Sequence, residues 1–439
     1  MTENNDIHIE ESKCAFAGAT GQAVSKGQTV RSVDGAQVTN NPKLRFKGFE
    51  GEWKKLKLGD IFSERTESDK EGEMLSVTMH EGIIKASDNG RFDNSSSDKS
   101  NYKLVLEKDI AYNSMRMWQG ASGCSHYRGI VSPAYTVITP NEGVDSMFFA
   151  YYFKTKPMIE KFRLHSQGLT KDTWNLKFPT FSKIFVAYPQ NIKMQQKIAS
   201  YFSALDHRIA LQSQHLERLK QVKEASLQAM FPQEGETVPK IRFKGFDGDW
   251  KKEKLNSFAK RIMRKNSNLE STLALTIASA YGLVSQIDYF NNSVVGANLK
   301  NYYLLKKGEF AYNKSYSNGY PFGSVKRLDR YEQGILSTLY IVFDIDDSIS
   351  SDYLTHFFDT TLWHKEVAER AAEGARNHGL LNIGAEDFLD INIWKPQTKE
   401  EQQKIASYFS ALDRKIELQS QRLEKLKQIK AACLDKMFV

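Results

Sequence analysis

The chain has 439 residues, 40% of them hydrophobic and 12% aromatic, which leaves room for about two to four domains with packed cores and excludes a chain that is disordered throughout. Its 61 basic and 53 acidic residues give a net charge of +8, which is compatible with a polyanionic partner such as nucleic acid without requiring one. The polar, acidic start MTENNDIHIEESK, the lack of a long apolar run and three widely spaced cysteines argue against a signal peptide, a membrane span and a disulfide framework, so we expect a cytoplasmic protein.

Residues 1–41 are rich in Gly, Ser, Thr, Asn and Gln, which is typical of a flexible tail. A different composition begins at Pro42 with PKLRFKGFEGEWKKLKLGDIF, and the chain repeats this stretch at Pro239 as PKIRFKGFDGDWKKEKLNSF. Shorter matches follow in the same order, such as the tripeptide AYN at residues 111–113 and again at 311–313. The chain is therefore a global duplication.

Each copy ends in a long segment without Pro or Gly. Residues 195–231 read QQKIASYFSALDHRIALQSQHLERLKQVKEASLQAMF, residues 402–438 read QQKIASYFSALDRKIELQSQRLEKLKQIKAACLDKMF, and the two agree at 27 of 37 positions. Both are dominated by Ala, Leu, Glu, Lys, Gln and Arg, so each is predicted to form one helix of roughly 55 Å.

Within these two helices a 4-3-4-3 spacing of apolar residues predicts a coiled-coil seam. The seam residues are Ile198, Phe202, Leu205, Ile209, Gln212, Leu216 and Leu219, with Ile405, Phe409, Leu412, Ile416, Gln419, Leu423 and Leu426 at the same places in the second copy. A polar Gln is costly against apolar side chains, but two such residues can meet and fix the register. We predict that the helices pack on each other in antiparallel orientation; an intermolecular dimerisation coil is the alternative.

Between the duplicated markers, short apolar runs bounded by Gly, Pro, Asn and Asp predict strands, and two longer stretches predict helices. The predicted strands are Ile110–Tyr112, Tyr135–Ile138, Ile184–Ala187, Leu339–Phe343 and Ile391–Trp394, and the predicted helices are Met147–Lys161 and Tyr353–Ala371. The predicted fold class is α+β, with two pseudo-twofold-related domains separated by an antiparallel coiled coil of two long helices. The expected segments are residues 1–41 (tail), 42–193 (first domain), 194–231 (central helix), 232–400 (second domain) and 401–439 (C-terminal helix), so that the C-terminus lies near Pro42.

No catalytic constellation is present in both copies. The chain has no GxxxxGK[ST] phosphate loop, and the FKGFEG stretch at residues 46–51 predicts aromatic packing at the entrance to the domain. Residues 132–135, SPAY, weakly resemble a methyltransferase box but lack its second Pro, so we interpret them, and residues 337–340, as strand residues. Cys124 and His126 have no further ligands at metal spacing, which favours a buried thiol over a metal or nucleophile site.

Two pairs of loops carry side chains suited to base edges and phosphates, because Arg favours guanine, Asn and Gln favour adenine, and Lys and Ser can bind phosphates. One pair, residues 113–123 and 313–323, follows the AYN tripeptides, and the other, residues 166–175 and 373–379, precedes the last strands. Ordinary polar surface loops are the alternative, but sequence variation concentrates here within a duplicated frame. The predicted DNA contacts are Asn113, Arg116, Trp118, Gln119, Ser122, Gln167, Lys171 and Asn175, and in the second half Asn313, Lys314, Tyr316, Asn318, Tyr320, Arg376, Asn377 and His378.

The repeated QxKIAxx(F/L)SxLDxxI helices, the RFxGFxGxW entrances and AYNSMRMWQGASG followed by GIVSPAY resemble the specificity subunit of type I restriction-modification systems over residues 42–439. This resemblance implies two target-recognition domains, each reading half of a bipartite double-stranded DNA site. It also implies two modification subunits, which bind S-adenosylmethionine and methylate adenine, and two restriction subunits, which use ATP and Mg. The chain itself would have no catalytic residue, no metal and no cofactor. The outer faces of its long helices, which carry Gln212, Gln214, His215, Arg218 and Lys220 or their copies, would be divided between the seam and contacts with partners.

Because the loops of the two halves differ, the two half-sites are expected to differ in sequence. A rod of about 55 Å would separate two readers by roughly one to one and a half turns of B-DNA. Two other functions remain open at this stage: a stand-alone DNA-modifying enzyme, and a structural coiled-coil adaptor that does not bind DNA.

Overall fold

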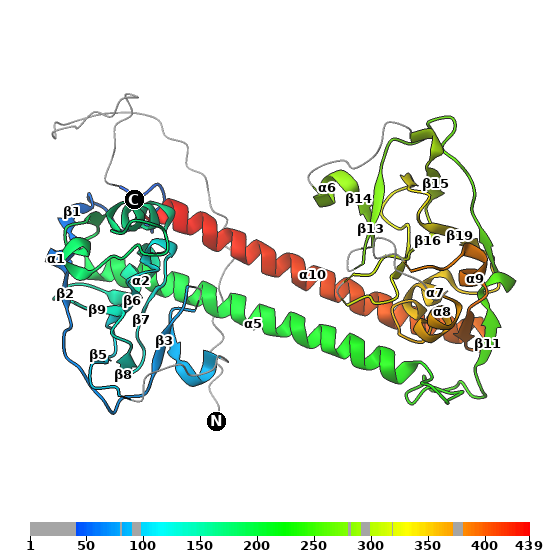
Figure 1. The fold of residues 1–439 in the computed structure, drawn as a ribbon, viewed down its shortest axis with the longest axis horizontal. Helices are drawn as coiled ribbons and strands as arrows, with labels where there is room; N and C mark the ends of the chain where they lie inside the picture. Colours follow the sequence, from blue (N-terminus) through cyan, green and yellow to red (C-terminus); the bar gives the residue numbers. More distant parts are fainter. Residues whose placement is uncertain are drawn as a thin grey trace. The chain divides into compact units, whose positions relative to one another are not determined.

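The structure of the chain is a computed structural model, drawn in Figure 1. It describes residues 41–79, 81–89, 98–279, 282–290, 299–317, 319–371 and 381–439. The chain divides into two compact units: the first contains the residues up to Phe202 together with Ala431–Val439, and the second contains Ser203–Lys430. Among the described helices, none combines the length and apolar character that a bilayer span requires.

The first unit contains a four-stranded antiparallel sheet in the order β2-β9-β6-β7 and three two-stranded pairs, β1-β10, β3-β4 and β5-β8. The central strand β6 is almost entirely apolar and buried because it has a partner strand on each side. The elements are β1 (Lys54–Lys57), α1 (Leu58–Ile61), β2 (Phe62–Glu64), β3 (Leu75–Val77), β4 (Ile83–Lys85), η1 (Ala86–Asn89), β5 (Lys103–Val105), β6 (Ile110–Asn113), η2 (Met117–Gln119), β7 (Ser122–Cys124), β8 (Gly129–Val131), β9 (Tyr135–Pro140), α2 (Ser146–Tyr152), α3 (Lys156–His165), α4 (Phe178–Phe181) and β10 (Phe185–Tyr188).

The second unit repeats this topology, with the sheet β12-β19-β16-β17 and the pairs β11-β20, β13-β14 and β15-β18. Each strand pairing of the first unit therefore has a counterpart, as the duplicated sequence predicts. The elements are β11 (Lys251–Lys254), η3 (Leu255–Ser257), β12 (Ala259–Arg261), β13 (Leu275–Ala278), β14 (Gly282–Ser285), α6 (Gln286–Phe290), η4 (Leu299–Asn301), β15 (Tyr303–Lys306), β16 (Phe310–Asn313), β17 (Ser324–Arg327), β18 (Gln333–Leu336), β19 (Ile341–Ile345), α7 (Ser351–Phe357), α8 (His364–Arg370), α9 (Ala385–Leu389) and β20 (Asn392–Lys395).

Both copies have a glycine at the same position of the fold, and the close packing there explains why. A Cβ on Gly129 in β8 would lie 2.4 Å from the carbonyl oxygen of Glu73, and a Cβ on Gly334 in β18 would lie 2.4 Å from Cδ1 of Leu275. Neither distance is compatible with a side chain, so both units need glycine where β8 and β18 pass the preceding segment.

The predicted strands are present with ends shifted by one or two residues, but each predicted helix of the domains is split in two. In the first unit α2 ends at Tyr152 and α3 begins at Lys156, directly before Pro157. A proline has no amide hydrogen to donate, so it fits the first turn of a new helix and not the middle of a long one. In the second unit α7 ends at Phe357 and α8 begins only at His364.

The strand interpretation of residues 132–135 and 337–340 is wrong, because these residues form turns, with only Tyr135 entering β9. The amide of Tyr135 donates to the carbonyl of Ser132 at 3.0 Å, and the amide of Tyr340 donates to the carbonyl of Ser337 at 3.2 Å. The duplicated Ser and Tyr thus define one tight turn that occurs once in each unit.

The predicted long helices are α5 (Ile192–Met230) and α10 (Lys399–Met437), each of 39 residues. They pair within the chain and in antiparallel orientation: Gln212 Nε2 donates to Gln419 Oε1 at 2.6 Å, while Asp206 Oδ1 lies 2.5 Å from Lys430 Nζ. Every predicted seam residue is buried or half-buried. The prediction of an intramolecular seam in which the two glutamines meet is confirmed.

The end of α10 lies in the aromatic core of the first unit. The ring of Phe438 stacks on Tyr152 with centroids 5.0 Å apart and contacts Phe148 at 5.2 Å. The amide of Leu44 donates to the carbonyl of Lys436 at 2.8 Å. The end of the helix is therefore close to the start of the first domain, as predicted.

The end of α5 is held in the same way in the second unit. The ring of Phe231 lies 5.7 Å from Tyr353 and 5.9 Å from Trp250. Burial of a phenylalanine side chain contributes about 1.5–3 kcal/mol relative to exposure, so each long helix is anchored at its C-terminal end by an aromatic residue.

The duplicated entrance segments also pack against the long helices. The ring of Phe46 meets Tyr201 of α5 edge to face at 5.6 Å, and the ring of Phe243 meets Tyr408 of α10 at 6.3 Å. This confirms the aromatic packing predicted for the FKGFEG stretch and its copy.

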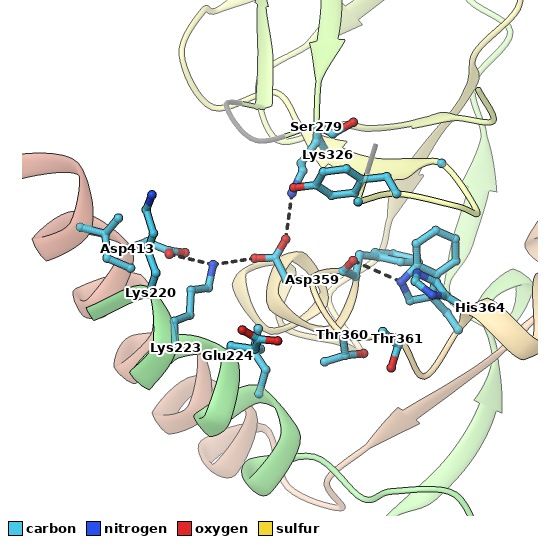
Figure 2. A pocket seen from close by; sticks show the side chains of 17 residues that line it. Lys220, Lys223, Glu224, Ser279, Lys326, Asp359, Thr360, Thr361, His364 and Asp413 are labelled. Carbon is cyan, nitrogen blue, oxygen red and sulfur yellow. Dashed lines mark hydrogen bonds and ion pairs between the residues drawn. The ribbon is translucent and has the colours of Figure 1, made fainter. Parts of the chain in front are cut away.

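A cluster of half-buried charges joins both long helices to the sheet of the second unit (Figure 2). Lys223 Nζ on α5 lies 2.9 Å from Asp359 Oδ2 and 2.7 Å from Asp413 Oδ1 on α10. Lys326 Nζ on β17 lies 2.8 Å from Asp359 Oδ1. Burial alone would raise the pKa of the Asp359 carboxyl, but the charges of Lys326 and Lys223 hold that pKa well below its ordinary value.

Replacing Asp359 by Asn tests this cluster. The folded pKa of Asp359 is below its unfolded value, so its contribution is complete above the ordinary Asp pKa of about 4 and is lost as the pH falls through the folded pKa. We expect Asp359→Asn to lower the free energy of unfolding at neutral pH by about 3 kcal/mol. Urea unfolding from neutral to acidic pH should show the variant and the wild type converging below about pH 4.

The matched control is Asp206→Asn. Asp206 pairs with Lys430, but the two side chains are 40% and 28% exposed, so the loss should stay below about 1 kcal/mol. Two results would contradict the role given to Asp359. One is an equal loss of unfolding free energy in the two variants, and the other is a loss in Asp359→Asn that does not change with pH.

Candidate nucleic-acid interface

The first candidate loop, here called the AYN loop of the first unit, covers residues 113–121 between β6 and β7. It opens with an Asx turn, in which the amide of Met115 donates to Asn113 Oδ1 at 3.0 Å. It closes at Gly120, whose φ of 81° is readily adopted only by glycine. Lys154 Nζ donates to the carbonyl of Gly120 at 2.5 Å, which fixes the loop to the segment after α2.

The second candidate loop of the first unit, here called the hairpin loop, covers residues 167–175. Its ends are joined by two backbone hydrogen bonds between Gln167 and Asn175, of 3.0 Å and 2.8 Å. At its tip the amide of Thr173 donates to the carbonyl of Thr170 at 3.0 Å. The loop is therefore a small, regular hairpin and not an open surface connection.

These two loops, far apart in the sequence, are in contact. The amide of Leu176 donates to the carbonyl of Ser114 at 2.8 Å. The indole rings of Trp118 and Trp174 meet edge to face at 5.3 Å, and Trp118 Nε1 donates to the carbonyl of Met115 at 3.0 Å. The sequence placed predicted contacts on both loops, and the structure brings them together at one site.

The second unit repeats one backbone bond of this junction within its described residues. Its AYN loop, residues 313–323, opens with the amide of Ser315 donating to Asn313 Oδ1 at 3.0 Å. The amide of Leu381 donates to the carbonyl of Lys314 at 2.9 Å, which repeats the bond between Leu176 and Ser114. Lys314 Nζ donates to a backbone carbonyl of its own unit at 3.3 Å, so its ammonium group helps to hold the junction.

The predicted contact residues differ in exposure. In the first unit Asn113, Trp118 and Asn175 are half-buried, and in the second Asn313, Lys314 and Tyr320 are half-buried while Tyr316 is 55% exposed. The residues Asn318, Arg376, Asn377 and His378 lie outside the described residues. The exposed predicted contacts of the first unit are Arg116, Gln119, Gln167 and Lys171.

The prediction that Ser122 contacts DNA does not agree with its place in the structure. It is paired with Tyr112 inside the sheet as the first residue of β7 and has no exposed surface. A side chain in that position cannot reach a ligand on the loop surface, so Ser122 belongs to the core. The sequence could not reveal this, because the β6-β7 register decides where the loop ends.

The exposed charged side chains of the two loops in the first unit are Arg116, Lys171 and Asp172, so the loops carry a net positive charge. Arg116 and Lys171 are joined there by Lys177, which sequence reasoning did not select and which lies two residues after the hairpin loop. Among the described residues, none of these three side chains makes an ion pair within the first unit. Unpaired cations beside amide side chains can contact phosphates and base edges.

No catalytic group emerges at either junction within the described parts of the chain. Cys124 is buried, which confirms the predicted buried thiol, and this burial raises the pKa of the thiol to about 12. The described residues contain one group with metal-ligand geometry, His356, Asp359 and Asp413. The ammonium of Lys223 already lies between its two carboxylates, so the cluster is an internal ion network.

A comparison with protein families finds one match that covers both halves of the chain. The family described as type I restriction modification DNA specificity domain matches residues 50–221 and again residues 248–428. No curated protein matches the sequence.

Solved structures provide a likeness of fold. The S subunit of a type I restriction-modification system from M. genitalium is 14% identical, with a TM-score of 0.56, covering 91% of this chain and 99% of that chain. The HsdS subunit from Thermoanaerobacter tengcongensis is 15% identical, with a TM-score of 0.44, covering 88% of this chain and 96% of that chain. At these identities the likeness concerns the fold alone. The S subunit from M. genitalium is the structure that supports it.

The Trp118–Trp174 contact can be tested by a double-mutant cycle. If the two rings hold the loops together, Trp118→Ala and Trp174→Ala should each destabilise the chain, and the double variant should lose less than the sum. The expected coupling free energy is about 0.5–1.5 kcal/mol. Denaturant unfolding of the four proteins measures it, and strictly additive losses would show that the two loops are not coupled through these rings.

Proposed function

Because the chain belongs to the family of type I restriction-modification DNA specificity proteins, we propose that it reads an asymmetric bipartite DNA site through two different domains. The observation that supports this most is the repeated loop junction. The bond between Leu176 and Ser114 in one unit and the bond between Leu381 and Lys314 in the other fix AYN loops of unlike sequence at the same place in the frame. Two readers of the same build but different surface chemistry would recognise two different half-sites.

In the first unit the hydrogen-bonding groups of the exposed side chains indicate whether each would contact a base or a phosphate. Arg116 can donate two parallel hydrogen bonds to a guanine, and Gln119 or Gln167 can pair with the edge of an adenine. Lys171 and Lys177 suit phosphate oxygens, which fix position without reading sequence. Asn113 and Asn313 shape their loops through Asx turns, so we assign them no direct contact.

In the second unit Tyr316 offers an exposed ring and hydroxyl from the AYN loop. Tyr320 is half-buried and borders a cavity of about 380 Å³ that also includes Lys220 and His364 (Figure 2). Asn318, Arg376, Asn377 and His378 remain proposed contacts on sequence grounds. The different residues of this unit would read the other half-site.

The long helices are the proposed scaffold for partner subunits. On α5 Leu211 and Val222 are 51% and 47% exposed, and on α10 Leu418 and Ile429 are 54% and 37% exposed. Residues eleven apart lie on one flank of a helix. The duplication therefore leaves the same apolar stripe uncovered twice, which fits two copies of one partner.

We assign these partners as two modification subunits, with two restriction subunits added to the assembled complex. S-adenosylmethionine, ATP and Mg would be bound by those subunits, and this chain would contribute recognition and assembly without catalysis. The two apolar stripes support the number of modification subunits, and the residues described in this chain offer no site that calls for a cofactor of its own.

The proposed function is tested by mapping adenine methylation across a host genome that carries the modification subunit, with and without this gene. A bipartite motif should be methylated only when the gene is present. Replacing Arg116 by Ala should weaken the free energy of DNA binding by about 1–3 kcal/mol. It should also relax the base preference at one position of one half-site only. Methylation that is unchanged when the gene is deleted would overturn the proposal.

The matched control for this position is Arg163→Ala. Arg163 is also an exposed arginine of the first unit, but it is paired with Glu160 at 2.6 Å on α3. Its removal should leave the methylated motif unchanged. If Arg116→Ala weakens methylation equally at all sequences, Arg116 contacts phosphate and does not read a base.

The scaffold assignment predicts a change in stoichiometry. A charge placed in one apolar stripe, by Leu211→Lys or Leu418→Lys, should reduce the complex from two modification subunits to one, because a lysine buried at that contact would lose its hydration. The double variant should bind none. Native mass spectrometry of the purified complexes counts the subunits, with Glu217→Lys and Glu424→Lys on the opposite flank as controls that should still bind two.

A further inference from the structure

A leucine directly before the tip turn of the hairpin loop of the first unit is fully exposed to solvent. The relative exposure of Leu169 is 102%, higher than that of any other large apolar side chain among the described residues. A leucine that touches nothing contributes no buried area to the stability of the fold. Its whole side chain is therefore available for a contact outside the chain.

The hairpin that carries Leu169 is built to hold it in place. A Cβ on Gly168 would lie 2.5 Å from the carbonyl oxygen of Thr173, so the two arms of the hairpin are in direct contact. Backbone hydrogen bonds between Gln167 and Asn175 close its base. The ring of Trp174 packs against Trp118, which ties the hairpin to the AYN loop. The leucine is thus presented from a braced element.

The surroundings of the tip indicate what it contacts. Lys171 lies on the hairpin and Lys177 two residues after it, Arg116 lies on the loop packed against it, and Gln167 is exposed at its base. An apolar partner surface on a protein would leave these unpaired cations without compensation. A nucleic acid duplex offers phosphates for the cations and an apolar stack of bases for the leucine.

We propose that Leu169 is a wedge that inserts between two base pairs of the first half-site. This inference rests on the proposed function and deepens it. Leucine is one of the side chains that proteins insert between base steps, and partial unstacking of a step costs a few kcal/mol. Lys171 and Lys177 would hold the flanking phosphates while the step opens.

The wedge adds specificity that needs no hydrogen bond to a base. Pyrimidine–purine steps unstack more readily than others, so the energetic cost of insertion depends on the step that is opened. The first half-site, or its edge, is therefore expected to contain such a step at the position of Leu169. Neither the AYN loop nor the cations would produce this preference.

The test uses the full chain in complex with its modification subunits, bound to a duplex that carries the methylated motif. 2-Aminopurine replaces adenine at successive positions of the first half-site, and its fluorescence rises when its stacking is lost. We expect a severalfold rise at one step with the wild-type chain, no rise with Leu169→Ala, and a rise restored by Leu169→Met. Affinity for the motif should fall roughly tenfold in the alanine variant while affinity for random DNA is kept.

Leu164→Ala is the matched control, since Leu164 is 65% exposed but belongs to α3 and not to the hairpin loop. It should behave as wild type. An unchanged fluorescence rise with Leu169→Ala would overturn the wedge while leaving the proposed function intact. Loss of subunit assembly with Leu169→Ala would overturn it in favour of a protein contact, and a wild-type complex that does not prefer the motif would overturn the proposed function itself.

Discussion

The structure depends on the pairing of two helices whose seam residues are 207 positions apart in the sequence, as Gln212 and Gln419 are. Apolar residues supply most of the burial along the seam, but they would tolerate a shift of one heptad. The glutamine pair does not, because a shifted register would leave two half-buried amides facing apolar side chains. The pair therefore costs some stability and sets the register. Each helix ends in an aromatic core, at Phe231 in one unit and Phe438 in the other, so the register also determines where each core is completed.

The two units share one fold, but they differ where a short domain helix packs against a long helix. In the first unit the ring of Tyr151 packs on Phe202 at 5.2 Å, and in the second His356 packs on Phe409 at 5.5 Å. Burial lowers the pKa of His356, although the neighbouring carboxylates of Asp359 and Asp413 oppose this shift. Both copies keep an ion pair between the two long helices, Asp206 with Lys430 in one and Asp413 with Lys223 in the other. The second copy extends this pair with Asp359 and Lys326 into a larger, half-buried ion network. The same pattern holds at the loop junctions, where one backbone bond is shared and the side chains are not.

Much of the frame was predictable because its signals are local and periodic. The seam positions follow from spacing alone, and the meeting of the two glutamines follows from the antiparallel duplication. The helix breaks were missed for a local reason: Pro157 marks the start of α3, whereas the break between α7 and α8 carries no proline. The burial of Ser122 and the contact of Trp118 with Trp174 could not be predicted, since both depend on which strands and loops become neighbours. The exposure of a side chain also depends on the folded chain. The sequence therefore did not distinguish Leu169 from the other residues of its polar loop.

The central claim is that two independent readers of unlike sequence are carried on one duplicated frame. The most direct measurement is the methylated motif produced by a chain in which residues 42–191 are replaced by a second copy of residues 239–398, with α5 and α10 kept intact. Because the paired helices run antiparallel, the account predicts an inverted repeat made of the second half-site and its complement. An assembled, active complex that still methylates a motif containing the bases of the first half-site would contradict it.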